Sequence, residues 1–103
     1  MLKNLTPHVI TIVMANGEKI EIPSHGTVRL SETTSAITEY EGVPIVRKTY
    51  GSADLPPENS GDLYIVSALV RQAFPERKDL VSPGDLIRDE NGSVIGCRNL
   101  ICN

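Results

Sequence analysis

The 103-residue sequence has little cysteine, few aromatic residues and no long apolar run. Cys97 and Cys102 are five residues apart and point to opposite faces if one strand carries both, so we do not expect a disulfide between them. The longest strongly apolar run, residues 9–14, is far shorter than the roughly 20 residues that span a bilayer. No apolar stretch typical of a signal peptide follows Met1. These absences predict a cytoplasmic protein with no membrane partner.

The sequence also lacks an excess of cations. It has 10 Lys and Arg against 13 Asp and Glu, a formal net charge of −3, and no run of basic residues. A protein that binds the backbone of DNA or RNA needs clustered cations. The aromatic fraction of 4% is too low for stacking along a single strand. We therefore expect no nucleic-acid partner, whereas a small anionic ligand held by a few arginines is compatible with this balance.

Motifs for metal binding and nucleophilic catalysis are missing as well. Neither Cys-x-x-Cys nor His-x-x-x-His spacing occurs. No Gly-x-Ser-x-Gly motif surrounds Ser67, and no pair of carboxylates stands out for acid–base chemistry. We expect no metal and no cofactor, and the sequence favours a protein without catalytic residues.

The length fits one domain, residues 1–103, and is too short for two. A chain of this size buries only about 60–70% of the surface that its unfolded form exposes, so it holds one modest core without a deep, fully walled cleft. A second copy could supply the missing wall. The length is therefore compatible with a homo-oligomer.

Turn residues and β-branched runs predict a chain of short strands. Asn16-Gly17 and Asn91-Gly92 supply the positive φ angles of tight hairpin turns, and Glu41-Gly42 marks a further hairpin. Residues 8–14 are apolar at both parities, which is typical of a strand covered on both sides. The predicted strands are residues 8–14, 19–22, a short stretch through Val28 and Leu30, 37–40, 44–50, 63–66, 85–88 and 94–101. The predicted irregular segments are residues 31–35, 51–61 and 76–82, with a turn at Pro83-Gly84.

One short helix interrupts these strands. Ser67 is a good N-cap because its hydroxyl can accept from a free N–H of the first turn. Val66, Leu69, Val70 and Ala73 follow at helical spacing as one buried stripe, and Pro75 ends the helix. The sequence thus predicts a mostly β member of the α+β class: a compact antiparallel sheet or small barrel of about six to eight short strands with one short helix.

The opening of this helix is the first candidate ligand site. Free N–H groups and the helix dipole attract anions, and Ser67 is followed by Arg71, Arg77, Lys78 and Arg88. Arginine binds phosphate in a bidentate way, so Ser67 and one or two of these arginines could hold a phosphate or pyrophosphate. In the alternative interpretation Ser67 only caps the helix and the arginines are solvated.

Four further residues complete the candidate site. Thr6 and His8 begin the first predicted strand, and His8 has the parity of Ile10. Arg47 lies on a strand face where an inward-facing guanidinium would need a partner, and Tyr50 could stack on a base. The alternatives are that His8 is a structural residue and that Arg47 pairs with a glutamate on a sheet surface.

Several stretches resemble a family of small, largely uncharacterised proteins of tailed phages, prophages and actinobacterial genomes. The motifs Leu-Thr-Pro-His at 5–8, Tyr-Ile-Val-Ser at 64–67 and Ile-Gly-Cys-Arg at 95–98 carry the resemblance, which covers nearly the full length. Further matching stretches are residues 22–28, 42–47, 50–51, 55–56, 77–80 and 88–89. The resemblance implies a phage context, and one class of small phage proteins sequesters the cyclic or ADP-ribose-derived nucleotides of bacterial immune signalling.

Three hypotheses follow. The first is non-catalytic binding of a small anionic, nucleotide-like ligand, such as a cyclic nucleotide or an ADP-ribose derivative, to sequester an immune signal. The second is a small hydrolase or lyase acting on such a nucleotide, with His8 as general base. The third is a structural or protein-interaction module whose polar motifs only hold loops in place.

Overall fold

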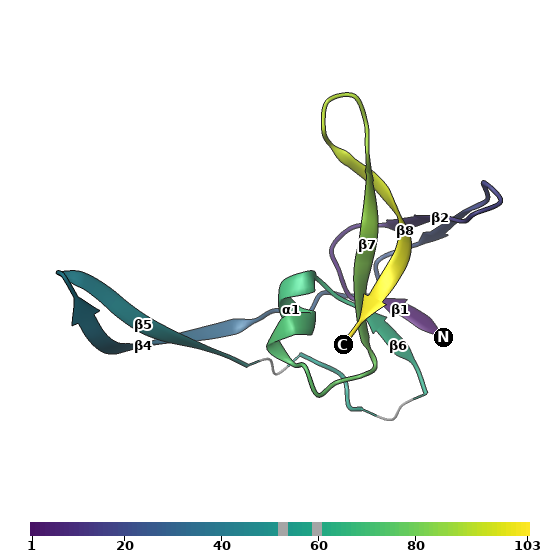
Figure 1. Cartoon of the computed structure of the whole chain (residues 1–103). Helices are drawn as coiled ribbons and strands as arrows, with labels where there is room; N and C mark the ends of the chain where they lie inside the picture. Colours follow the sequence, from purple (N-terminus) through teal and green to yellow (C-terminus); the bar gives the residue numbers. More distant parts are fainter. Residues whose placement is uncertain (52–53, 59–60) are drawn as a thin grey trace.

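The computed structural model describes residues 1–51, 54–58 and 61–103, and it shows a small β body from which a long hairpin extends (Figure 1). In the described part of the chain, eight strands and one short helix follow each other, which confirms a mostly β chain. Their bounds are β1 Leu2–Asn4, β2 Ile10–Val13, β3 Lys19–Ile22, β4 Ser31–Tyr40, β5 Val43–Gly51, β6 Leu63–Ile65, α1 Ala68–Ala73, β7 Leu80–Arg88 and β8 Val94–Cys102.

Turn chemistry sets the three hairpins, which are confirmed. Gly17, Gly42 and Gly92 adopt φ angles of +89°, +80° and +82°, a region open to glycine at little cost. In the β2–β3 turn the Asn16 side chain accepts from the backbone N–H of Glu18. In the β7–β8 turn Asp89 Oδ1 accepts from the N–H groups of residues 91 and 93. Local side-chain bonds of this kind explain why the hairpins could be predicted.

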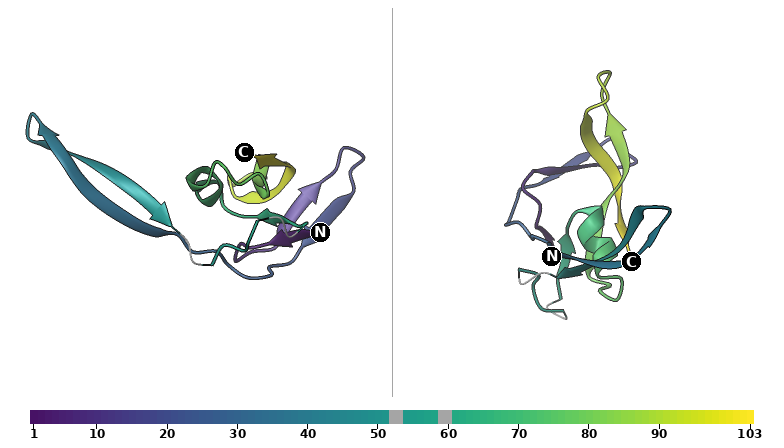
Figure 2. Two further views of the ribbon diagram at one scale, coloured as in Figure 1. Left: turned by 90° about the horizontal axis from the view of Figure 1, so that it is seen from below. Right: turned by 90° about the vertical axis from the view of Figure 1, so that its left-hand side faces the viewer.

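The body is one six-stranded mixed sheet in the order β1-β6-β7-β8-β2-β3. The pairs β2–β3 and β7–β8 are antiparallel, whereas β1–β6, β6–β7 and β2–β8 are parallel. The two edge strands almost meet, because Asn4 forms a bridge with Ser24 and the His25 N–H donates to the Asn4 carbonyl at 2.7 Å. The sheet is therefore nearly closed on itself, which confirms the small-barrel form of the prediction (Figure 2).

The core lies between this sheet and α1. Its buried members are Leu5, Val28, Tyr64, Val66, Val70 and Leu80, with Leu30, Leu55 and Phe74 packed against them. The helix begins after Ser67, whose hydroxyl accepts from the Val70 N–H at 3.2 Å, as predicted. Of the predicted helical stripe, Val66 and Val70 are buried, but Leu69 is 55% exposed. Six residues make too short a helix to bury a wider face.

The predicted loop at residues 31–35 is wrong, because these residues form the first half of β4. Thr33 and Thr34 pair with Thr49 and Lys48 across the hairpin. Polar composition suggested a loop, but β-branched threonine fits an extended strand well even when both faces are in water.

The predicted irregular segment 76–82 and the turn at Pro83-Gly84 are also partly wrong, because β7 runs from Leu80 to Arg88 without interruption. Pro83 and Gly84 pair with Leu100 and Asn99 of β8. Gly84 is needed for packing, since a Cβ there would collide with the side chains of Asn99 and Ile101. The Pro-Gly pair therefore marks a close approach of two strands, one of the known uses of glycine in a sheet.

Three smaller expectations also differ from the structure. Val28 and Leu30 lie in no strand, although Val28 is buried and its N–H donates to the Leu5 carbonyl. In the strand predicted to be covered on both sides only Ile12 is buried, and Val9 is 55% exposed ahead of β2. Of the predicted loop 51–61, Gly51 ends β5, residues 54–58 and 61 lie in no strand or helix, and residues 52–53 and 59–60 lie outside the described residues.

Candidate functional site

The predicted anion site at the opening of α1 is made of residues that already bind each other. Arg71 Nε donates to Ser82 Oγ at 2.8 Å, and its Nη1 donates to Asn103 Oδ1 at 3.1 Å. The Arg71 side chain therefore reaches β7 and the residue after β8 instead of being solvated. Ser67 serves as the helix cap. The arrangement fastens α1 to the sheet.

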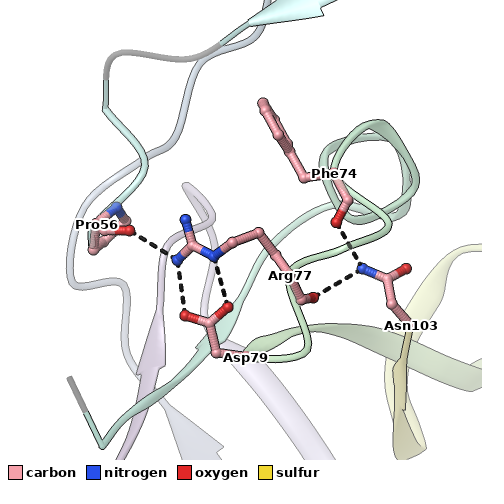
Figure 3. Close-up of polar contacts among 5 residues, drawn as sticks. All are labelled: Pro56, Phe74, Arg77, Asp79 and Asn103. Carbon is pink, nitrogen blue, oxygen red and sulfur yellow. Dashed lines mark hydrogen bonds and ion pairs between the residues drawn. The ribbon is translucent and has the colours of Figure 1, made fainter. Parts of the chain in front are cut away.

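The Arg77 guanidinium also binds groups within the fold (Figure 3). Its Nε and Nη2 donate to the two carboxylate oxygens of Asp79, both at 2.8 Å, and Nη2 also donates to the Pro56 carbonyl at 2.8 Å. The guanidinium lowers the pKa of Asp79, and the carboxylate raises the pKa of Arg77. Bidentate pairing of this kind is strong and directional. Arg77 therefore holds the segment around Pro56 against the body.

Asn103 connects these groups. Its Nδ2 donates to the carbonyls of Phe74 and Arg77 at 3.1 and 3.0 Å (Figure 3). It also donates to the carbonyl of Arg71 at 3.0 Å. The carbonyls at a helix C-terminus have no partner within the helix, so this amide serves as a side-chain cap there. The structure thus brings Ser67, Arg71 and Arg77 into one neighbourhood, and their polar groups serve the packing of α1.

Thr6 and His8 form hydrogen bonds with Asn4, a buried residue that was not among the predicted site residues. Asn4 is fully buried, and its Nδ2 donates to the carbonyls of His8 and Ile22 at 2.7 and 2.9 Å. Its Oδ1 accepts from the N–H and the hydroxyl of Thr6 at 2.9 and 2.6 Å. His8 itself is exposed. The Leu-Thr-Pro-His motif therefore forms a loop organised by Asn4 at the closure of the sheet.

The remaining predicted residues lie on elements that point away from one another (Figure 1). Arg88 is at the outer end of β7, where its Nη1 donates to the Gly92 carbonyl at 2.9 Å. Arg47 and Tyr50 belong to β5 in the extended hairpin. The alternation of side chains predicts which residues of one strand share a face, but it does not predict which strands become neighbours. The eight predicted residues do not assemble into one pocket.

The extended hairpin, residues 31–51, is the most unusual feature of the molecule, and we call it the arm. Its two strands pair with each other, and in the described part of the chain with no other strand (Figure 2). Every residue of β4 and β5 is exposed except Gly51, which is half-buried. The exposed large hydrophobic residues on it are Ile37, Tyr40, Val43, Ile45, Val46 and Tyr50.

The two halves of the arm differ in polarity, with a β-bulge between them. Near the body, Lys48 forms an ion pair with Glu32, which raises the pKa of the lysine. A β-bulge near Ile37 separates this polar half from the tip. Beyond the bulge, Tyr40 pairs with Val43 across the turn. The outer half of the arm is therefore its apolar half, and it is the half farthest from the body.

A second exposed apolar surface lies on the body, and we call it the groove. It encloses about 290 Å³. The exposed fractions of Val9, Leu86, Val94 and Ile95 are 55, 47, 51 and 56%. Cys97 is a buried residue of its lining, and burial raises the pKa of that thiol. The lining residues are His8, Val9, Ile10, Thr11, Pro83, Leu86, Val94, Ile95, Gly96 and Cys97.

The hairpin could be predicted from the sequence, but its projection from the body was not. The signal was present in Ser31–Ala36, which contains no large apolar side chain. A hairpin half without an apolar face has nothing to bury against a core. The groove had no comparable signal, because its lining comes from three separate strands.

Metal and membrane chemistry find no support in the described ranges. No group of three or more His, Cys, Asp or Glu side chains there lies close enough to hold a metal ion. Within the same ranges, no helix has both the length and the apolarity to cross a bilayer. No protein-family model, curated protein or solved structure matches the chain. The arm and the groove are the candidate functional surfaces because both expose large apolar side chains.

Proposed function

We propose that this protein is a self-associating structural module that uses its arm to contact another copy. The observation that carries the proposal is the excess of exposed surface. The chain exposes 7079 Å², about 1,400 Å² more than the roughly 5,700 Å² expected for a compact monomer of 11.2 kDa. Its radius of gyration is 16.6 Å, against about 13 Å for a compact domain of this length.

That excess matches the size of a protein interface. A standard stable interface buries about 800 Å² on each partner, so the surplus on one copy is enough for a complete contact. An isolated two-stranded hairpin is at best marginally stable in water. The arm has no cover from the body, and a partner that covers it stabilises it. Self-association supplies that partner from the same gene product.

The arm's side chains indicate how it makes contact. Tyrosine and branched aliphatic residues dominate the tip, and aromatic residues are enriched at interface cores. Toward the body, the Lys48–Glu32 pair and the bulge near Ile37 interrupt the free strand edges, which limits uncontrolled edge-to-edge pairing. The arm therefore favours a defined contact through side chains at the tip.

The three earlier hypotheses now differ in support. Arg71 and Arg77 are engaged in internal hydrogen bonds, so anion binding at α1 would have to break contacts that hold the fold. Sequestration of a nucleotide, phage origin and cytoplasmic location stay predictions. Hydrolysis with His8 as base also stays a prediction. The interaction module is the hypothesis that rests on an observed surface.

The test measures mass as a function of concentration, by light scattering on a sizing column and by sedimentation. The variant is Tyr40→Ser with Val43→Ser, and the matched control is Met14→Ser with Ile20→Ser, two exposed apolar residues on the β2–β3 hairpin. We expect an oligomer for the unmodified chain and the control. Burial of each tip side chain is worth about 1.5–3 kcal/mol, so the variant should dissociate at least about 100-fold more easily.

Two results would overturn the proposal. One is an unmodified chain that stays at 11.2 kDa up to millimolar concentration. The other is an oligomer whose stability is the same in the arm variant as in the control. Circular dichroism of each variant establishes that the fold is intact, since all four substituted residues are exposed.

A further inference from the structure

We infer that the tip of the arm of one copy seats in the groove of a second copy. This inference rests on the proposed self-association and specifies its geometry. The strands that line the groove, β2, β7 and β8, lie on the opposite side of the body from the tip of the arm (Figure 1). The arm therefore cannot fill the groove of its own chain, and a second copy is the natural occupant.

The tip presents one apolar face of suitable composition. Tyr40 and Val43 are directly paired across the turn, and Ile45 is two residues beyond Val43 on the same strand. Since side chains alternate along a strand, these three share one face of the arm. Their exposed fractions are 70, 58 and 43%.

The groove offers the complementary surface. Its lining is mainly aliphatic, and its 290 Å³ has room for about ten water molecules. Those waters meet few polar partners along Val9, Leu86 and Ile95. Release of poorly bound water by an apolar group favours association. The groove and the tip are thus two apolar surfaces of one chain, each without a cover in the described residues.

Charged groups flank both the tip and the groove. The tip carries Glu39 and Glu41 beside its apolar face. The groove is lined at one end by His8, and Arg88 pairs with the groove residue Val94 at the other. The acid nearest Arg88, Asp89, accepts two backbone N–H groups in its own turn. Glu90 follows Asp89, so this end of the groove carries charges of both signs, and Arg88 is the cation that an acidic tip can meet there.

The contact is heterologous, because the donating and the receiving surfaces are different parts of the chain. Each copy then gives its arm to one neighbour and receives an arm from another. Such contacts extend beyond a pair unless two copies exchange arms reciprocally. Either way, a copy with an altered groove can still give its arm to the intact groove of an arm variant, so a mixture of the two variants should keep one contact of this kind.

The experiment is disulfide trapping between two singly labelled proteins. Both carry Cys102→Ser to remove the exposed thiol, and Cys97 is retained because it is buried. One protein carries Val43→Cys at the tip and the other Val94→Cys in the groove. After mixing and mild oxidation, we expect a covalent species of twice 11.2 kDa on a non-reducing gel, at least about tenfold stronger than with Ile20→Cys in place of Val94→Cys.

A second variant removes the receiving surface without cysteine. Leu86→Ser with Val94→Ser should abolish self-association to the same degree as Tyr40→Ser with Val43→Ser. An oligomer that depends on the arm but forms no tip-to-groove disulfide, and that survives the groove substitutions, would overturn this inference and leave the proposed function intact. A chain that is monomeric throughout would overturn both. A disulfide formed only between two Val43→Cys tips would show an arm-to-arm contact and would also overturn the inference.

Discussion

Replacement of Asn4 by alanine should destabilise the body more than any change at an exposed asparagine. The side chain is fully buried and takes part in four hydrogen bonds of 2.6–2.9 Å, to His8, Ile22 and twice to Thr6. A net value of about 0.5–1.5 kcal/mol for each bond, together with the carbonyls left without a donor, gives a loss of about 3–4 kcal/mol. A chain of this length has about 5–15 kcal/mol in total.

The measurement is urea unfolding followed by circular dichroism, with thermal unfolding as a second probe. We expect the midpoint temperature of Asn4→Ala to fall by about 15 °C or more. Asn16→Ala is the control, because Asn16 is exposed and accepts one turn hydrogen bond, so its loss should stay within about 1 kcal/mol. Equal losses for the two variants would refute the role assigned to Asn4 in closing the sheet.

Asn4→Asp adds a readout that depends on protonation. The carboxylate keeps the acceptor for Thr6 but places an oxygen, instead of an N–H donor, against the carbonyls of His8 and Ile22. Burial and these carbonyls raise the pKa of the new group in the folded state. Its contribution to stability is therefore largest at low pH and is lost as the pH rises through that pKa. A pH-independent deficit would contradict this explanation.

Three further predictions concern the body. Gly84→Ala should cost about 1–3 kcal/mol in urea unfolding, because its Cβ would overlap side chains of β8. Arg77 lowers the folded-state pKa of Asp79. The ionised Asp79 therefore stabilises the fold fully above the ordinary carboxyl pKa of 3.8, and this stabilisation is lost as the pH falls through the lowered pKa. In a pH series of unfolding midpoints, Asp79→Asn should remove this acid-dependent loss of stability. A thiol reagent at neutral pH should label Cys102 rapidly and Cys97 only after denaturation, since burial raises the pKa of Cys97, and equal labelling rates would contradict its placement.

The sequence was most informative where structure depends on neighbouring residues. The Asn-Gly turns, the Ser67 cap and the stop at Pro75 all act within a few residues, and the structure has the hairpins and the helix at these positions. The mostly β class followed from the same signals. Composition misled at residues 31–35, because a polar threonine-rich strand and a loop have similar composition. The turn predicted at Pro83-Gly84 was wrong because glycine also occurs where two strands approach closely, as Gly84 does here.

The candidate site depended on contacts that no local pattern encodes. The helix and Ser67 were predicted, but Arg71 binds Ser82 and Asn103, 11 and 32 residues away. Arg77 binds the carbonyl of Pro56, 21 residues away, as well as the nearby Asp79. Only the fold shows that these guanidinium groups are used internally. Asn4 was not predicted to have a role, because the sequence does not show which asparagine becomes buried. The arm and the groove depend on which strands leave the body and which join it.

The order of strands in the nearly closed sheet has a consequence for how the chain folds. Leu2 pairs with Leu63 and Ile12 with Cys97, so the body needs contacts between the first and last parts of the sequence. Such non-local pairing is slow to form, typically within milliseconds to seconds. The arm is a local hairpin that closes without waiting for them. A nascent or refolding chain therefore presents its apolar tip before a groove exists to receive it, and refolding at high concentration should lose yield to aggregation through the arm.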